Sequence, residues 1–164
     1  MNRLNYCGKG MWITITEFED RSPQLLPGSS VPIEGYWIKF QADIVSGRTL
    51  LVPAGSGIEE LHRGLSLPHI SVETSQKAVL NFRLLDETED HDYRFEPLQY
   101  PGDYGLRGRV SNIWVLDDGT LWAVYVIVGT CGFDISPEEV GINTVQEGVW
   151  VQFQVLQLEF DENL

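Results

Sequence analysis

The sequence predicts an all-β protein, mainly antiparallel, built as a barrel or sandwich of about eight strands with only short helical turns. Apolar and polar residues alternate in several stretches, whereas the 3.6-residue period of an amphipathic helix is nearly absent. The Asp-Asp-Gly sequence at 117–119 lies between two β-rich runs and is the strongest hairpin signal in the chain. A helical turn is expected to start at Ser136 and to end by Gly141.

The expected strands follow one another along the chain, with turn-forming residues between them. Residues 36–44 show the alternation most clearly, and Tyr36, Ile38 and Phe40 share one face of this strand. In the last strand the inward face switches near residues 155–156, as a β-bulge would cause. The expected strands span residues 11–18, 36–44, 49–52, 70–73, 78–85, 106–116, 120–128 and 149–160.

The segment 105–160 has the broad order of an OB-like barrel: a long strand, a hairpin, a third strand, a short helical turn and a final strand. Such barrels often bind single-stranded nucleic acid on a face that is both aromatic and basic. The segment is rich in aromatic residues, but Arg107 and Arg109 are the only lysines or arginines from residue 95 onward. An OB-like fold is therefore an option, and this composition disfavours the nucleic-acid binding that often accompanies it.

We predict a single compact β domain over residues 1–164, with a pseudo-duplicated arrangement as a further option. Residues 34–41 and 147–154 share five identities in eight positions, and the offset between matched residues is constant at 113. A repeat would pair two similar units in one barrel or build two small barrels. The alternative is convergence, because glycine followed by an aromatic residue is a common entry to a strand. The two halves and the acidic connection between them would be residues 1–85, 105–164 and 86–104.

The chain is strongly acidic, with 24 acidic and 11 basic residues and a net charge of −13. A field of this sign repels phosphate backbones and anionic lipid headgroups, so binding to nucleic acid or to a membrane surface is disfavoured. The same field favours a basic protein partner. The alternative explanation is that the charge only keeps the protein soluble.

Two isolated cysteines, Cys7 and Cys131, form neither a disulfide framework nor a zinc motif. We interpret them as free thiols in a reducing compartment. No signal peptide is visible, and no apolar run approaches the roughly 18 residues of a membrane span. The sequence therefore predicts a cytoplasmic protein without a membrane segment and leaves its oligomeric state open.

The chain has no recognisable catalytic motif, and we expect neither a metal nor another cofactor. His62, His69 and His91 do not have metal-ligand spacing, and the carboxylates at 138–139 favour a helix dipole without any catalytic role. The acidic run at 86–92 lacks the glycine that lets a calcium loop turn sharply. We interpret this run as a solvated loop or as a docking surface for a basic partner. Its candidate binding residues are Asp86, Glu87, Glu89, Asp90 and Asp92.

The five tryptophans are expected to lie mostly in the core, since tryptophan is highly buried on average. Trp37 and Trp150 are exceptions, because strict alternation points each of them away from the face that carries the neighbouring core residues. Each therefore lies on a second buried face or on an exposed interaction surface. We take Trp37 and Trp150 as further candidate binding residues.

The sequence favours a non-enzymatic, acidic protein-binding domain of inhibitor, immunity or assembly type that acts on a more basic partner. Two alternatives stay open. An OB-like module that binds a ligand or single-stranded nucleic acid would need a local basic groove. An enzyme with an unrecognised site would need a deep pocket with polar groups converging near a histidine or an acidic pair.

Overall fold

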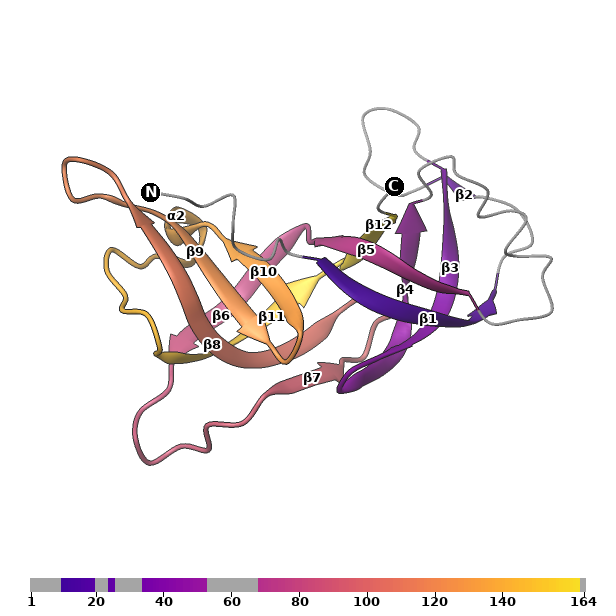
Figure 1. The fold of residues 1–164 in the computed structure, drawn as a ribbon, viewed down its shortest axis with the longest axis horizontal. Coiled ribbons are helices and arrows are strands. Elements are labelled where there is room, and N and C mark those ends of the chain that lie inside the picture. The colour runs from indigo at the N-terminus through magenta and orange to yellow at the C-terminus, as the bar shows by residue number, and fades with distance from the viewer. Residues whose placement is uncertain (1–9, 20–23, 26–33, 53–67, 163–164) are drawn as a thin grey trace.

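The computed structural model describes residues 10–19, 24–25, 34–52 and 68–162. Within these ranges the chain forms two β-sheets that lie side by side along the long axis of the molecule (Figure 1). Among the described residues all strand pairs but one are antiparallel, the only helix is a single turn, and no helix is long and apolar enough to cross a membrane. The predicted all-β, mainly antiparallel class is confirmed.

The N-terminal sheet contains six strands: β1 (Gly10–Phe18), β2 (Gln24–Leu25), β3 (Glu34–Ala42), β4 (Val45–Val52), β5 (His69–Ser75) and β12 (Glu159–Glu162). β1 pairs with β3 on one side and with β5 on the other, so the pairings return to their starting strand. Around this ring, called the N-terminal barrel below, the order is β1-β3-β4-β12-β5. The short β2 pairs only with the start of β3.

The strand order of the N-terminal barrel is that of an OB-type barrel. Numbered along the chain, its five strands follow the order 1-2-3-5-4-1, and the third and fifth strands, β4 and β12, are the parallel pair. The OB-like arrangement was predicted for residues 105–160, but the complete ring lies in the other sheet. Alternation along a strand shows which face is buried, but it does not identify the neighbouring strand.

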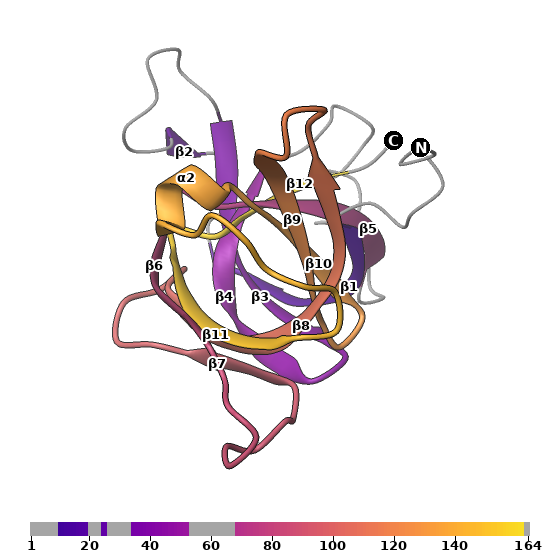
Figure 2. The same cartoon turned by 90° about the vertical axis from the view of Figure 1, so that its left-hand side faces the viewer.

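The C-terminal sheet contains β6 (Ala78–Leu84), β7 (Arg94–Pro97), β8 (Tyr104–Val115), β9 (Leu121–Val128), β10 (Cys131–Ile135) and β11 (Trp150–Leu156). Its order is β10-β9-β8-β11-β6, and β7 pairs with the first half of the long β8. The helix α2 (Pro137–Val140) lies against β6 and β9 at one end of the curved sheet (Figure 2). The predicted succession is therefore confirmed from the long strand β8 through its hairpin with β9, the third strand β10 and the helical turn α2 to β11.

Side chains complete the two edges of the C-terminal sheet, where the path of paired strands ends at β10 and β6. Thr74 Oγ1 donates a hydrogen bond to the carbonyl of Gly132 at 3.1 Å, and Gln76 Nε2 donates to a second β10 carbonyl at 3.1 Å. At the other edge, the main-chain N–H of Val79 donates to the carboxylate of Glu139 in α2 at 3.0 Å. Side chains thus satisfy three main-chain groups at these edges, where the ladder of paired strands ends.

The chain crosses from one sheet to the other where a single last strand was expected. β11 ends at Leu156, Gln157 has a positive φ of 50°, and β12 follows in the N-terminal barrel. The carboxylate of Asp103 accepts a hydrogen bond from the main-chain N–H of Gln157 at 3.0 Å and so holds the turn. The prediction of one bulged strand over 149–160 is therefore wrong, because the change of face marks a change of sheet.

Aromatic rings form a continuous chain of contacts through both sheets. Phe40 of the N-terminal barrel packs against Phe160 of the same barrel and against Tyr104 of β8, with ring centroids 4.8 and 6.4 Å apart. Tyr104 packs in turn against Phe95 at 5.1 Å, and Phe95 against Phe133 in the C-terminal sheet at 5.9 Å. All five side chains are buried. The two sheets therefore share one core. That they fold as a single domain stays a prediction.

The segments that match in sequence take different places in the two sheets. Residues 34–41 lie in β3, between β1 and β4, and most of residues 147–154 lie in β11, between β8 and β6. Two strands also pair across the division predicted between the halves: β6 joins the C-terminal sheet and β12 joins the N-terminal barrel. The repeat stays a hypothesis.

Candidate functional site

The acidic run predicted as a docking surface forms a structured loop between β6 and β7, called the acidic loop below (residues 85–93). Asp86 accepts two hydrogen bonds from Thr88, and Glu89 accepts one from the main-chain N–H of Asp86 at 2.9 Å and one from Arg83 at 2.6 Å. The hydrogen bonds from Thr88 hold the pKa of Asp86 below its usual range. The pKa of Glu89 is also lowered, first by the hydrogen bond from the main-chain N–H of Asp86 and then by the hydrogen bond from Arg83. Two of the predicted binding carboxylates therefore shape the loop.

A third carboxylate ties the acidic loop to the sheet. Asp92 accepts hydrogen bonds from Arg94 at 3.1 Å and from Arg107 at 2.7 Å, and these bonds, in that order, lower its pKa. The Arg107 side chain, from β8, is only 11% exposed. Its guanidinium also donates to Gln152 at 2.9 Å and to the carbonyl of Asp90 at 3.0 Å. Arg107 is thus the anchor that joins the acidic loop to β8 and β11.

Trp150 packs against residues of the acidic loop. Its ring stacks on His91, with centroids 5.5 Å apart and planes 14° from parallel, and contacts Tyr93 at 4.9 Å. The carbonyl of Trp150 accepts a hydrogen bond from the main-chain N–H of Leu85 at 2.8 Å. The structure therefore brings together Trp150 and the acidic run, two candidates that the sequence singled out separately, and leaves Trp150 half-buried.

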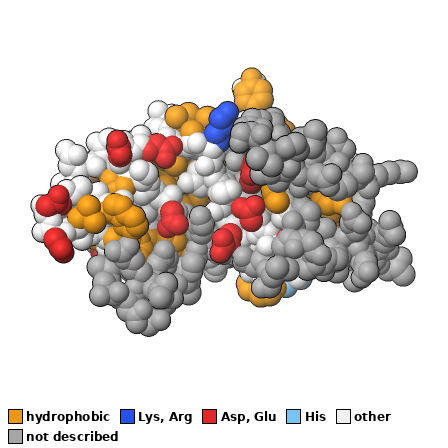
Figure 3. Space-filling model, turned by 90° about the horizontal axis from the view of Figure 1, so that it is seen from above, with side chains coloured by type: hydrophobic (Ala, Val, Ile, Leu, Met, Phe, Trp, Pro, Cys, Tyr) orange, Lys and Arg blue, Asp and Glu red, His pale blue; other side chains and the backbone are white. Residues whose placement is uncertain are grey.

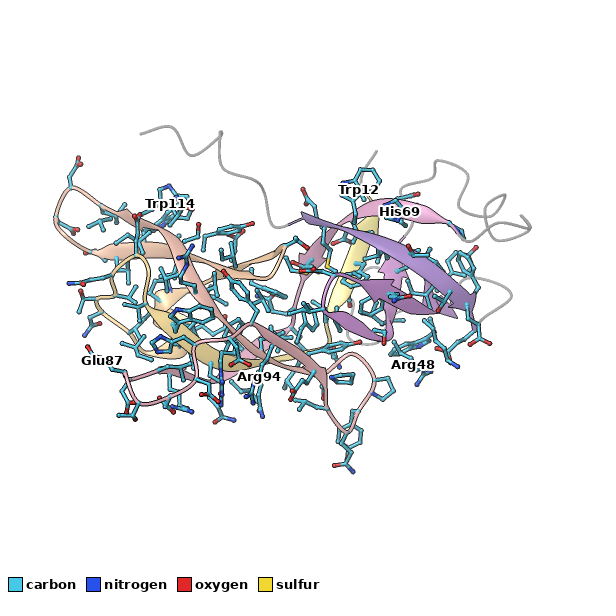
Figure 4. The ribbon with its side chains drawn as sticks, turned by 60° about the horizontal axis from the view of Figure 1, so that its bottom comes forward. Trp12, Arg48, His69, Glu87, Arg94 and Trp114 are labelled. Carbon is cyan, nitrogen blue, oxygen red and sulfur yellow. The ribbon has the colours of Figure 1, made fainter. Side chains whose placement is uncertain are left out.

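Glu87 and Asp90 are the two other carboxylates of the acidic loop that the sequence singled out. Both are exposed, with 84% of the Asp90 side chain accessible, and Asp90 lies 3.9 Å from Arg94. Figure 4 shows Glu87 at the outer edge of the molecule. A docking role for the acidic loop thus depends mainly on these two residues.

Trp37 lies in the N-terminal barrel, in a different sheet from Trp150. The guanidinium of Arg48 lies over its ring, 5.2 Å from the centroid, and Arg48 Nε donates to Glu19 at 2.6 Å. The main-chain N–H of Glu19 donates to the carbonyl of Trp37 at 2.9 Å. Trp37, Arg48 and Glu19 form a cation–π and ion-pair cluster, called the Trp37 cluster below.

A groove of about 650 Å³ opens between the β8–β9 turn and α2, at one end of the C-terminal sheet. The residues that line this end groove include Asp118, Trp122, Glu138, Ile142 and Asn143. Trp122 is 55% exposed. The sequence analysis interpreted these positions only as a turn, a helix start and a core tryptophan, and so missed the groove.

Turn chemistry positions Asp118 at the mouth of the end groove. Gly119 takes a positive φ of 89°, and Leu116 and Thr120 close the turn with a 2.8 Å hydrogen bond. Thr120 N–H donates to Asp118 at 2.9 Å, and the side-chain and main-chain hydrogen bonds of Thr120 hold the pKa of Asp118 below its usual range. The predicted hairpin is confirmed, and Asp118 stays ionised at neutral pH.

The helical turn α2 positions Glu138 on the opposite side of the groove. Pro137 occupies its first turn, and Gly141, with a φ of 73°, ends it. The predicted turn is confirmed, although the Ser136 side chain forms no capping hydrogen bond. Glu139 bonds the edge of β6, whereas Glu138 lines the groove. The neighbouring carboxylates therefore have different roles, one structural and one available to a ligand.

The end groove lies in a long stretch of the chain that has no positively charged residue. Residues 110–164 contain nine aspartates and glutamates and no lysine, arginine or histidine. Seen from above, the described part of this end carries Asp and Glu side chains around hydrophobic ones, and the Lys or Arg atoms in view are confined to one place nearer the middle (Figure 3). The charged side chains described at this end are therefore mostly negative, and this charge attracts a cation.

Most of the lysines and arginines in the described ranges are neutralised by internal ion pairs. The described ranges contain seven lysines and arginines, and five of them pair with carboxylates at 2.6–3.1 Å. These five are Lys39, Arg48, Arg83, Arg94 and Arg107. The described residues that line the end groove include no lysine or arginine.

A second exposed aromatic feature lies on the N-terminal barrel. Trp12 is 62% exposed, and its ring stacks on His69, 5.2 Å away, which also lies 3.1 Å from the hydroxyl of Thr14. Figure 4 shows Trp12 and His69 side by side over β1 and β5. The prediction of core tryptophans is confirmed for Trp114 and is wrong for Trp12 and Trp122, because these two point to the solvent faces of β1 and β9.

The described residues contain no group of three or more His, Cys, Asp or Glu that could hold a metal ion. His69 and His91 line neither the end groove nor a smaller cavity of about 200 Å³ on β6, β8 and β11, and His62 and Cys7 lie outside the described residues. Burial raises the pKa of the Cys131 thiol to about 12, so it is protonated at neutral pH. The end groove gathers two carboxylates, an indole and an amide, which are groups suited to binding.

Comparisons with protein-family models, with curated proteins and with solved structures give no match to this chain. The function is therefore argued from the geometry and charge of the described residues.

Proposed function

We propose that this protein is a protein-binding domain of inhibitor, immunity or assembly type that holds a more basic partner at the end groove. The observation that carries the proposal is an open groove with two carboxylates and a largely exposed tryptophan, set in a stretch of chain without any positive charge. Carboxylates supply charge complementarity, and an exposed aromatic ring supplies the apolar contact typical of binding hot spots.

The distribution of ion pairs supports a basic partner over simple solubility. Carboxylates near β6, β7 and the Trp37 cluster are used in internal ion pairs, whereas Asp118 and Glu138 line an open surface. A charge that only kept the protein soluble would not need to border a groove. Electrostatic complementarity mainly speeds association, so the groove would act by steering the partner.

Glu87 and Asp90 of the acidic loop offer a second, smaller acidic surface. Neither residue lines the end groove or the smaller cavity of about 200 Å³, and the loop uses its other carboxylates to hold its own structure. We therefore assign them an auxiliary, long-range role in attracting the partner. The pair E87Q/D90N removes the same charge as the groove pair D118N/E138Q and serves as its matched control.

The test starts with capture of partners from the source cell lysate and identification of proteins released in discrete salt steps. Any basic protein recovered is then produced separately and its association is measured with the intact chain. We expect the association rate constant to fall roughly tenfold or more as ionic strength rises from about 0.01 to about 0.15 M. D118N/E138Q should weaken binding more than E87Q/D90N. Recovery of no basic protein, or binding that is insensitive to salt, would contradict the proposal.

A second candidate function rests on the stacked Trp12–His69 pair. Exposed aromatic rings on an OB-type barrel are the usual platform for stacking nucleobases. The test is the fluorescence anisotropy of a labelled oligothymidine at low salt, with Trp12→Ala as the variant. A saturable signal that W12A removes would favour this function, and an unchanged anisotropy would exclude it for this probe. The net charge of −13 opposes it.

A further inference from the structure

The smaller cavity of about 200 Å³, called the small cavity below, lies on the outer face of the C-terminal sheet. Gln152 and Gln154 of β11 line it, and they alternate along the strand with buried core residues. One residue at its rim, Arg94, is labelled near the middle of the molecule in Figure 4. The small cavity and the end groove share no described lining residue and are separate features. The polar lining of the small cavity comes from four strands: Asn81, Arg94, Glu96, Arg107, Gln152 and Gln154.

The small cavity exists because a row of long side chains is interrupted by a glycine. Gly105 of β8 lies opposite Glu96 of β7 on one side and opposite Gln154 of β11 on the other, and all three residues line the cavity. Side chains of cross-strand partners stand next to each other on the same face of a sheet. Glycine at the middle of this row therefore leaves a hollow between the other two side chains.

Gly105 is required neither by packing nor by its backbone conformation. In the same strand, a Cβ at Gly108 would clash with the carbonyl oxygen of Ile127, so close packing demands that glycine. A Cβ at Gly105 would meet only the side chain of Leu98, at 3.5 Å, which is an ordinary contact, and Gly105 has no positive φ. Glycine weakens the interior of a strand, and its presence there often marks a site where a ligand approaches closely.

The amide side chains around the hollow keep hydrogen-bonding groups available. Gln152 Oε1 accepts two hydrogen bonds from Arg107, at 2.9 and 3.3 Å, and Gln154 Oε1 accepts one from Asn81 Nδ2 at 3.0 Å. The Nε2 donors of both glutamines have no hydrogen-bond partner among the described residues, and the same holds for the acceptors of Asn81 Oδ1 and the Glu96 carboxylate. The small cavity therefore offers both donors and acceptors to a ligand.

The charges around the small cavity suit a neutral ligand. Arg94 and Arg107 both donate to Asp92, at 3.1 and 2.7 Å, and Arg94 also lies 3.9 Å from Asp90, so the positive charges are offset within the protein. The net charge of −13 repels an anion, and the carboxylate of Glu96 at the cavity adds to this repulsion. The two guanidinium groups oppose a cation at the same place.

We propose that the small cavity binds a neutral sugar residue, a single hexose ring whose hydroxyl groups bond Gln152, Gln154 and Glu96. A hydroxyl both donates and accepts, so adjacent hydroxyls serve the amide donors and the carboxylate acceptor together. The two oxygens of a carboxylate accept hydrogen bonds from two neighbouring hydroxyls, whereas a peptide main chain supplies only one N–H per residue. The inference goes beyond the proposed function and does not depend on it.

The dimensions of the small cavity fit one ring. Its volume of about 200 Å³ lies below the roughly 300–1,000 Å³ of pockets that take drug-sized ligands. Gln152 and Gln154 are two residues apart on one face of β11, which separates them by roughly 7 Å. Hydroxyls on opposite sides of one hexose ring cover such a distance. Leu98, beside Gly105, offers an apolar contact to the carbon–hydrogen face of the ring.

The experiment is a titration of the intact, ¹⁵N-labelled protein with the methyl glycosides of glucose, galactose and mannose. The resonances to follow are the main-chain amide of Gly105 and the side-chain amides of Gln152 and Gln154. We expect at least one glycoside to shift all three resonances saturably, with a dissociation constant on the order of 1–10 mM for so small a ligand. Cyclohexanol, a ring with a single hydroxyl, should cause no saturable shift.

Three variants locate the interaction. Gly105→Ala puts a methyl group into the hollow, where its contact with Leu98 is tolerated, and should raise the dissociation constant roughly tenfold. Gln154→Leu removes the amide and should raise it about fivefold or more. Gln146→Leu makes the same change at an exposed glutamine that does not line the small cavity, and should leave the dissociation constant within about twofold. Unchanged chemical shifts elsewhere would show that each variant is folded.

Several results would overturn the inference. The first is the lack of a saturable shift with all three glycosides, and the second is an affinity that neither Gly105→Ala nor Gln154→Leu lowers more than Gln146→Leu does. Two further ligands test the ligand class. Tighter binding of N-acetylglycine N-methylamide than of any glycoside would indicate a peptide site. Tighter binding of methyl glucuronide than of methyl glucoside would mean that the arginines recognise an anion.

Discussion

The N-terminal barrel and the C-terminal sheet share one aromatic core but differ in how their edges are completed. In the barrel, main-chain pairing runs around a full ring, and the last strand, β12, comes from the far end of the chain. In the C-terminal sheet, the edges at β10 and β6 are capped by side chains from β5 and α2. The acidic loop and the end groove both belong to this second sheet.

This difference suits the N-terminal barrel to the role of scaffold and the C-terminal sheet to the role of binding surface. A closed ring leaves few unsatisfied main-chain groups and few open surfaces for a loop or helix to occupy. A sheet completed by side chains keeps its ends available, and α2 and the β8–β9 turn use one of these ends to form a groove. We therefore expect the barrel to dominate stability and the C-terminal sheet to dominate binding.

The largest expected effect comes from removing a buried aromatic side chain of the shared core, in either of the two sheets. Phe160→Ala in the barrel and Phe153→Ala in the C-terminal sheet each remove a buried ring, and each should lower the free energy of unfolding by about 3–5 kcal/mol. Urea unfolding followed by fluorescence and by circular dichroism should show one coincident transition for both variants. Two separate transitions would mean that the sheets are independent domains.

The next effect concerns the anchor of the acidic loop. Arg107→Ala leaves the loop without its buried donor and should cost about 1.5–3 kcal/mol of unfolding free energy, because several charge-assisted hydrogen bonds are lost together. Tryptophan fluorescence should change because Trp150 loses its stacking contact with His91. Arg109→Ala, at an exposed position two residues along the same strand, is the control and should be nearly neutral. Equal effects would show that the loop is not anchored by Arg107.

A smaller effect tests the side-chain closure of the C-terminal sheet. Thr74→Val removes the buried hydroxyl that donates to Gly132 and should cost about 1–2 kcal/mol. Amide hydrogen exchange should quicken along β10 more than along β4. An equal increase in the amide exchange rates of β10 and β4 would indicate that the Thr74–Gly132 hydrogen bond contributes only to global stability.

The smallest effect compares the two regions by their response to acid. Hydrogen bonds lower the pKa of Asp86, Glu89 and Asp92 in the folded loop, so their stabilising contribution is present above the usual carboxyl pKa and is lost as pH falls through the lowered values. In the barrel, burial, followed by the charge of Asp161, raises the pKa of Glu159, so its ionised form costs stability above that pKa.

At acidic pH we therefore expect the acidic loop to lose stability, while protonation of Glu159 removes one unfavourable charge from the barrel. The protection factors of the loop amides, which correct for the intrinsic pH dependence of hydrogen exchange, should fall as the pH drops below the usual carboxyl pKa of about 4. Glu159→Gln should raise the unfolding midpoint slightly at neutral pH and leave it unchanged near pH 3, where the native glutamate is protonated. A gain of equal size at both pH values would mean that the charge of Glu159 has no part in it.

Much of the local structure could be predicted, but the site could not. The Asp-Asp-Gly hairpin and the Ser-Pro helical turn were recognised because both depend on residues close together in sequence. The groove that these two elements form escaped prediction, since nothing local says that they lie side by side. No local signal separates Trp122 from the core residue Trp114, because both lie in the same stretch without positive charge and only Trp122 is exposed.

The amino-acid sequence by itself determined the all-β class, the turns and the strong negative charge, because alternation, turn chemistry and charge are properties of neighbouring residues. The tertiary structure alone decided that β12 crosses to the N-terminal barrel, that the acidic loop spends three carboxylates on its own anchoring, and that Trp122 faces a groove rather than the core. The physical reason is that strand partners and side-chain neighbours are selected by contacts between residues distant in the chain, and a local pattern does not specify them.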